Sequence, residues 1–212
     1  RQGDRRLKGG WGYYYPDGRV YDRWPRTSVT VWQVMALESA RLGGLSVPDQ
    51  VFTEARAFLL YAHQPDDGVV LYNHDPTRLA ANYWTLPGST PAGMFALSLL
   101  GEELNARPYE QSIDWVLERA PNGYRKGDAD EFVHEATGNL YFWYYGSLTM
   151  FRHGGDAWEQ WNRKLQDTLL PAQNSDGSWL PISLYAEYAG DTEQDRSYTT
   201  AMCVLTLEVY YR

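Results

Sequence analysis

The sequence predicts an all-α fold in which two kinds of helix alternate along the chain. Apolar residues recur at helical spacing in seven segments, and Gly, Pro or capping residues separate these segments. Every second segment is rich in small and aromatic residues, whereas the others are amphipathic and charged. Because a helix that is apolar all round is buried and an amphipathic one lies outside, the pattern predicts an inner and an outer layer, as in an α/α arc or barrel.

The helices are expected in pairs, each an inner helix followed by an outer one. Thr27 to Leu42 and Pro48 to about His63 form the first pair, with Gly43-Gly44 as the stop between them. The second pair starts at Thr90 and Arg107, the third at Asn139 and Asp156, and a last helix from Ser197 to Tyr211 has no partner. Three and a half helical hairpins are therefore expected, with strands only in short loop pairings around Tyr13 to Val20.

The length of the chain indicates how many domains it forms, and its charge excludes one class of partner. A chain of 212 residues is expected to form one domain, 1–212, with residues 1–26 as a loop that leads into the first helix. The net charge of −8 argues against a nucleic-acid partner, whose phosphates need a basic surface. No apolar stretch reaches the roughly 18 residues of a membrane span, so we expect a soluble chain without a signal peptide, whose compartment stays open.

One sequence motif follows the third outer helix, and two partial copies stand elsewhere. The complete copy is Gln173-x3-Gly177-x-Trp179. The partial copies are Gln64-x3-Gly68-x-Val70 and Gly9-Gly10-Trp11-Gly12. Glycine permits a turn with positive φ, a Gln amide can bind exposed backbone groups, and a Trp ring can seal two hairpins against each other. We therefore expect structural joints between hairpins at Gln173, Gly177 and Trp179 and at Gly10 and Trp11.

The motif resembles the QW repeat of the squalene-cyclase and protein-prenyltransferase superfamily. The stretches Thr27 to Leu37 and Tyr198 to Leu205 are similar to bacterial proteins described as prenyltransferase/squalene-oxidase-repeat proteins. This resemblance implies an α/α toroid, in which up to six helical hairpins surround a central cavity. With three and a half hairpins, the chain is expected to be the C-terminal part of a longer repeat protein or an incomplete ring. We therefore expect it to self-associate or to depend on further N-terminal hairpins.

The resemblance also directs attention to two kinds of catalytic site. Terpenoid cyclases of this fold use an Asp-x-Asp-Asp-Thr motif, in which a buried aspartic acid protonates an alkene. The nearest string here is Asp128-Ala129-Asp130-Glu131, which lacks the threonine and is expected in a solvated loop; Asp128 and Asp130 are nevertheless the candidate acids. The transferases bind zinc through Asp, Cys and His, but Cys203 has Ala201 where the Asp is needed. We therefore expect no metal and no cofactor.

The aromatic run Tyr141 to Tyr145 opens the third inner helix. Five consecutive aromatic residues cannot all face one side of a helix, so some of them are expected to line a cavity. Trp143, Tyr144 and Tyr145 are the candidate ligand-binding residues. Their rings suit an apolar chain, a carbocation or a sugar.

Three functions remain open at this point. The first is a non-catalytic module whose aromatic-lined concave face binds a hydrophobic or isoprenoid ligand, or a protein partner. The second is a terpenoid-cyclase-like enzyme acting on an isoprenoid. The third is a carbohydrate-binding or carbohydrate-cleaving protein, for which Asp128, Asp130, Glu131 and Glu135 form the only dense carboxylate cluster. A buried acid in an apolar cavity would favour the second function, and an acidic groove with Trp would favour the third.

Overall fold

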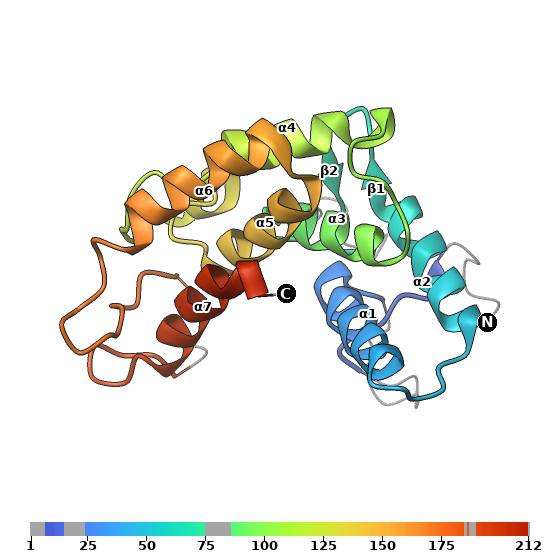
Figure 1. Ribbon diagram of the computed structural model, residues 1–212, viewed down its shortest axis with the longest axis horizontal. Helices are drawn as coiled ribbons and strands as arrows, with labels where there is room; N and C mark the ends of the chain where they lie inside the picture. The colour runs from blue at the N-terminus through green and yellow to red at the C-terminus, as the bar shows by residue number, and fades with distance from the viewer. Residues whose placement is uncertain (1–6, 15–23, 75–85, 185, 187–189, 212) are drawn as a thin grey trace. The chain divides into compact units, whose positions relative to one another are not determined.

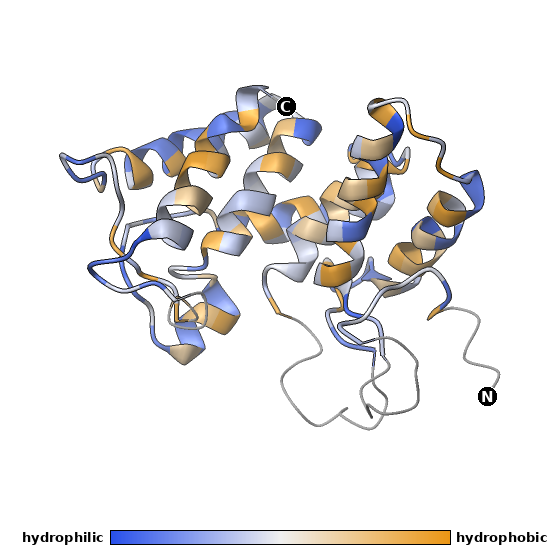
Figure 2. Cartoon of the chain, turned by 90° about the horizontal axis from the view of Figure 1, so that it is seen from below, coloured by the Kyte–Doolittle hydropathy of each residue, from blue (hydrophilic) through white to orange (hydrophobic). Residues whose placement is uncertain are grey.

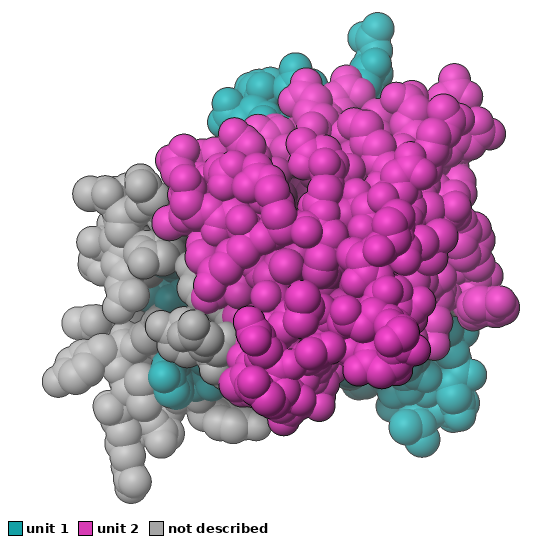
Figure 3. Space-filling model, turned by 90° about the vertical axis from the view of Figure 1, so that its left-hand side faces the viewer, with its two compact units in different colours: residues 1–112 teal, residues 113–212 magenta. Residues whose placement is uncertain are grey.

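The computed structural model describes residues 7–14, 24–74, 86–184, 186 and 190–211. Most of these residues are helical, so the all-α class is confirmed (Figure 1). The chain divides into two compact units, Arg1–Ser112 and Ile113–Arg212, which Figure 3 distinguishes by colour. Of the loop expected over residues 1–26, residues 7–14 and 24–26 are described.

Unit 1 contains the first three helices and a short strand pair. Its elements are α1 (Thr27–Leu42), α2 (Asp49–Ala62), β1 (His63–Gln64), β2 (Val69–Val70), α3 (Ser89–Leu99), the 3-10 turn Arg107–Tyr109 and the start of α4 (Glu110–Glu118). The strands are antiparallel, with His63 opposite Val70. This pairing lies elsewhere than the sequence indicated: Tyr13 and Tyr14 are not strand residues, and residues 15–20 lie outside the described part.

The core of unit 1 lies around α3. Helix α1 packs most extensively on α3, and α2 contacts both of them. Every residue of α3 from Ser89 to Leu97 is buried, as its small and apolar side chains predict. Helix α2 instead buries one face, with Phe58 and Leu59 at its centre. These patterns are those of a helix buried on most sides and of an amphipathic helix, and their arrangement in an inner and an outer layer stays a prediction.

Unit 2 contains the end of α4 and three further helices. The three helices are α5 (Leu140–His153), α6 (Gly155–Leu169) and α7 (Ser197–Leu207). One π-helical turn, Glu131–Glu135, precedes α5, and a 3-10 turn, Glu208–Tyr211, follows α7. Helix α5 packs against both α6 and α7. The Asn139 side chain caps α5 by accepting a 3.0 Å hydrogen bond from the Phe142 N–H. Gly146 lets α6 approach closely, because a Cβ atom there would lie 2.3 Å from the Trp161 ring.

The helices carry most of the hydrophobic residues, and many connecting segments are hydrophilic (Figure 2). Within the described residues, no helix combines the length and the apolar character that a membrane crossing requires.

Candidate functional site

Asp128 and Asp130 lie at the start of the π-helical turn, not in a plain loop. Asp128 Oδ1 accepts hydrogen bonds from the N–H groups of Asp130 and Glu131, both at 2.9 Å. Glu131 Oε2 in turn accepts one from the Asp128 N–H at 3.0 Å. This reciprocal pair is a capping box, which satisfies free backbone donors at the start of a helical turn. Asp128 is therefore engaged in holding the turn.

The surroundings of these carboxylates are polar. The Asp130 side chain is 87% exposed and lies 3.5 Å from His134 Nε2. A hydrogen bond from Arg125, together with the backbone bond from Asp128, lowers the pKa of Glu131 to about 2, so Glu131 is ionised at neutral pH. A cyclase proton donor needs the opposite conditions, namely burial and a raised pKa. The role of Asp128 and Asp130 as catalytic acids stays a prediction, and their geometry is that of a cap.

A pocket of about 270 Å³ lies in unit 2 where the π-helical turn ends, and we call it the π-turn pocket. Its lining residues come from α4, the segment after it, the end of the turn and α5: they are Glu118 to Gly123, His134 to Thr137 and Trp143. Ala136 has a φ of +58°, the only left-handed non-glycine residue in the described chain. Because π-turns and strained backbone both concentrate at functional sites, this pocket is the candidate functional site.

Arg119 holds the two walls of the π-turn pocket together. Its Nε–H donates to His134 O at 2.9 Å, and its Nη1–H donates to Trp115 O at 3.0 Å. The guanidinium also lies over the Trp115 ring, 3.9 Å from its centroid, in a cation–π contact. Burial lowers the pKa of Arg119 from its usual value. Arg119 therefore ties the end of α4 to the π-helical turn.

The three aromatic residues predicted to bind a ligand have different surroundings. Trp143 lines the π-turn pocket, although only 2% of it is exposed, and its ring lies 6.2 Å from that of Tyr124. Tyr144 and Tyr145 are buried and pack edge to face at 4.9 Å. The structure thus brings Trp143 together with His134 and Glu135, and it places the two tyrosines in the core of unit 2.

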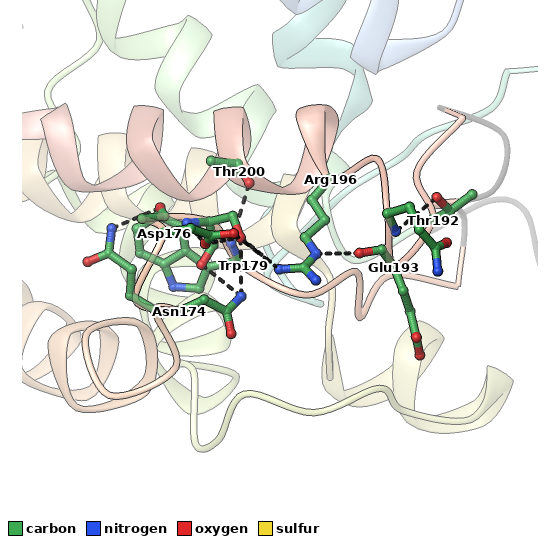
Figure 4. A network of polar contacts seen from close by, with 11 residues as sticks. Asn174, Asp176, Trp179, Thr192, Glu193, Arg196 and Thr200 are labelled. Carbon is green, nitrogen blue, oxygen red and sulfur yellow. Dashed lines mark hydrogen bonds and ion pairs between the residues drawn. The ribbon is translucent and has the colours of Figure 1, made fainter.

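The segment with the complete motif connects the end of α6 to the start of α7 (Figure 4). Gln173 Nε2 donates to Gly177 O at 3.0 Å, and Gly177 has a φ of +85°. Trp179 is buried, and its indole N–H donates to Leu169 O, the last carbonyl of α6, at 2.8 Å. Its backbone N–H donates to Thr200 Oγ1 of α7 at 3.4 Å. One residue therefore binds both helices.

Polar side chains next to this segment line an open hollow of about 660 Å³. Arg196 donates to Ser178 Oγ at 2.9 Å and to Glu193 O at 2.5 Å, and it lies 3.8 Å from Asp176 (Figure 4). Asp176 Oδ1 accepts two hydrogen bonds from Ser178. These bonds use the side chains for turn formation, as expected of Asp and Ser in tight loops.

The two partial motif copies share the backbone geometry of the complete one. Gly9 and Gly68 have φ values of +94° and +66°. Two residues after each glycine, a backbone N–H donates to a threonine hydroxyl of a following helix: Trp11 to Thr30 of α1 at 2.9 Å, and Val70 to Thr90 of α3 at 3.1 Å. We use the term joint for these segments and name each joint by its Trp or Val: the Trp11, Val70 and Trp179 joints. Gly10 packs between Pro25 and Phe58.

Thr30, Thr90, Thr200 and Arg119 are the residues that the sequence analysis missed. The threonines follow Trp11, Val70 and Trp179 by 19, 20 and 21 residues. A search for a hydroxyl residue at this near-constant distance from each motif would have found them. Arg119 carries no comparable signal, because its role depends on a π-helical turn that has no characteristic sequence period.

In the described residues, His, Cys, Asp and Glu form no group of three or more that could hold a metal ion. Cys203 is buried, and this burial raises the pKa of its thiol to about 12. Comparison of the chain with family models, with curated proteins and with solved structures gave no match. The resemblance to squalene cyclases and prenyltransferases therefore stays a prediction, and the functional argument depends on the geometry.

Proposed function

We propose that this chain is a helical binding module that holds a small hydroxyl-bearing ligand in the π-turn pocket. The observation that carries this proposal is the pocket itself: the end of a π-helical turn with a left-handed Ala136 lines it together with Trp143, and the capping box and Arg119 hold that turn. A volume of about 270 Å³ falls near the small end of ligand pockets, which range over roughly 300–1,000 Å³.

The chemistry of the lining decides the ligand class. Glu118 and Glu135 supply acceptors, whereas Asn122 and His134 can supply donors. A hydroxyl group both donates and accepts, so a polyhydroxylated ligand such as a sugar can use the whole lining. An isoprenoid chain would leave these polar groups unsatisfied. We therefore favour a carbohydrate-like ligand over the hydrophobic one that the sequence suggested first.

The α/α-toroid architecture is part of this proposal. The shared geometry of the Trp11, Val70 and Trp179 joints supports a helical repeat, and the QW resemblance accounts for the Gly and Trp positions. In such a scaffold the joints hold hairpins together, and the loops between helices are available for binding.

An NMR titration tests the binding proposal. Monosaccharides and small polyols are added to the ¹⁵N-labelled chain, and amide shifts are followed at residues 118–120, 122–123 and 134–137. The Glu135→Gln variant should weaken binding by about tenfold, because it loses a hydrogen bond to a charged acceptor. Glu159→Gln, at an exposed position of α6, is the matched control and should leave the affinity unchanged.

Two outcomes would contradict the proposal. One is the absence of shifts at these lining residues for every compound, and the other is an equal loss of affinity in both variants. One-dimensional ¹H spectra of the same samples show whether the ligand is altered during the titration. An unchanged ligand is expected of a binding module.

A further inference from the structure

Two threonine hydroxyls place α1 and α7 in a common register. Thr30 of α1 accepts the backbone N–H of Trp11, and Thr200 of α7 accepts that of Trp179. Each threonine stands three residues after the start of its helix, since α1 begins at Thr27 and α7 begins at Ser197. The two helices can therefore be compared position by position.

In this register, α1 and α7 bury largely opposite faces. Four of the five buried α1 residues, Thr27, Val31, Val34 and Glu38, correspond to Ser197, Ala201, Val204 and Glu208, which are all exposed, and the fifth, Thr30, corresponds to the half-buried Thr200. Of the four buried α7 residues, Met202, Cys203 and Thr206 correspond to Trp32, Gln33 and Ala36 of α1, which are also exposed, and Thr199 corresponds to the half-buried Val29. We call Ser197, Ala201, Val204 and Glu208 the α7 stripe, and Trp32, Gln33 and Ala36 the α1 stripe.

The order of the helices explains this reversal. The principal partner of α1 is α3, which follows it in the chain, whereas that of α7 is α5, which precedes it. Helix α1 therefore buries the face that packs on the helix after it. The α7 stripe is the corresponding face of α7. The chemistry agrees, because Thr27, Val31 and Val34 of α1 correspond to Ser197, Ala201 and Val204 of α7. Val204 is 39% exposed, whereas Val34 is fully buried.

We propose that the α7 stripe binds the α1 stripe of a second copy of this chain, head to tail. The choice of partner follows from the register. The exposed positions of α1 correspond to those with which α7 packs on its preceding helix, α5. One chain therefore exposes both surfaces of a helix pair of this kind, one on α1 and the other on α7. This contact continues the packing that α1 makes with α3 and that α7 makes with α5. The two surfaces differ, so the contact is heterologous and generates rings or open chains of copies. The inference does not depend on the proposed ligand.

Complementation between two variants tests the proposal. Ala201→Glu places a charge in the α7 stripe, and Ala36→Glu places one in the α1 stripe; both positions are exposed, so folding should be retained. Circular dichroism and thermal melting verify the fold of each variant. Light scattering should show concentration-dependent association of the wild-type chain and at least tenfold weaker association of either variant. Leu170→Glu, at an exposed apolar residue after α6, is the matched control and should associate like the wild type.

The mixture of the two variants distinguishes this contact from others. Each variant keeps the half that the other has lost, so a mixture should form one-to-one dimers and nothing larger. A symmetric α7–α7 contact would instead leave the Ala36→Glu variant dimeric by itself. That result would overturn the proposal, and so would a wild-type chain that stays monomeric up to about 1 mM or a mixture that stays monomeric.

Discussion

The Trp179 joint of unit 2 and the Val70 joint of unit 1 share a backbone and differ in how their core is filled. Both have a glycine with positive φ and an N–H bound to a threonine hydroxyl. At Trp179 a large indole fills the space and binds the end of α6. At Val70 a smaller side chain packs against Gly93 of α3, where an added Cβ atom would lie 2.7 Å from Val70 Cγ1. The polar anchor is thus the constant part, and the side chain adapts to the opposing helix.

The largest expected effect is that of removing the ring. Trp179→Ala should lower the free energy of unfolding by about 3–5 kcal/mol, since it leaves a cavity and removes the bond to Leu169 O. Val70→Ala should cost about 2 kcal/mol, because it removes two buried methyl groups. Urea unfolding of both variants measures the difference, and equal losses would show that the ring does not fill the joint.

The two joint glycines should respond differently to alanine. Both need a left-handed φ, which costs about 1–2 kcal/mol for alanine. At Gly68 the new Cβ atom would also lie 2.6 Å from Gln111 O, whereas at Gly177 the nearest atom is the flexible Gln173 Nε2 at 3.9 Å. Gly68→Ala should therefore cost about 3 kcal/mol and Gly177→Ala about 1–2 kcal/mol. A larger loss at Gly177 would contradict this account of the space in the two joints.

Much of the fold could be predicted because helices leave periodic signals. The expected first helix, Thr27 to Leu42, has the observed bounds of α1, and the second differs by one residue at each end. The π-helical turn Glu131–Glu135 was expected as a loop, since one turn is too short to show a period. The strand pair at His63 and Val70 has too few residues to alternate, so the sequence could not indicate it.

The candidate site was predicted only in part. The sequence pointed to Trp143 and to the carboxylates near Asp128. Trp143 and Glu135 line the pocket, whereas Asp128 does not. Burial decides the role of an aromatic run, and it depends on tertiary packing that no local pattern contains. For that reason Tyr144 and Tyr145 could not be assigned to the core in advance.

Acid should weaken unit 1, which contains both His63 and His74. His63, opposite Val70, donates or accepts at Ser112 Oγ at 2.9 Å, and burial lowers its pKa. Burial first, and then the charge of Arg26, lowers the pKa of His74 to about 4. Each histidine has a lower pKa in the folded chain than in the unfolded chain. Its contribution to the free energy of unfolding is therefore complete above pH 6.5 and falls as the pH drops from 6.5 towards 4.

Urea unfolding at several pH values measures this loss. His63→Gln and His74→Gln should each flatten the dependence between pH 6.5 and 4, because glutamine does not titrate. A slope that is unchanged in both variants would show that these histidines do not cause it.

The smallest effect is expected from the hydroxyl anchor. Thr200→Val keeps the shape of the side chain and removes the acceptor for the Trp179 N–H, which should cost about 1 kcal/mol. Thr200→Ser keeps the hydroxyl and should restore most of the anchor. A valine variant as stable as the wild type would mean that the 3.4 Å bond contributes nothing.

Amide hydrogen exchange at Trp11, Val70 and Trp179 tests most directly whether the three joints are built alike. Each N–H is bound to one threonine hydroxyl, at 2.9, 3.1 and 3.4 Å in that order. NMR exchange rates are compared between the wild type and the variants Thr30→Val, Thr90→Val and Thr200→Val. The account predicts that each variant accelerates exchange at its own partner amide and leaves the other two protected. Acceleration at all three amides in every variant, or at none, would contradict it.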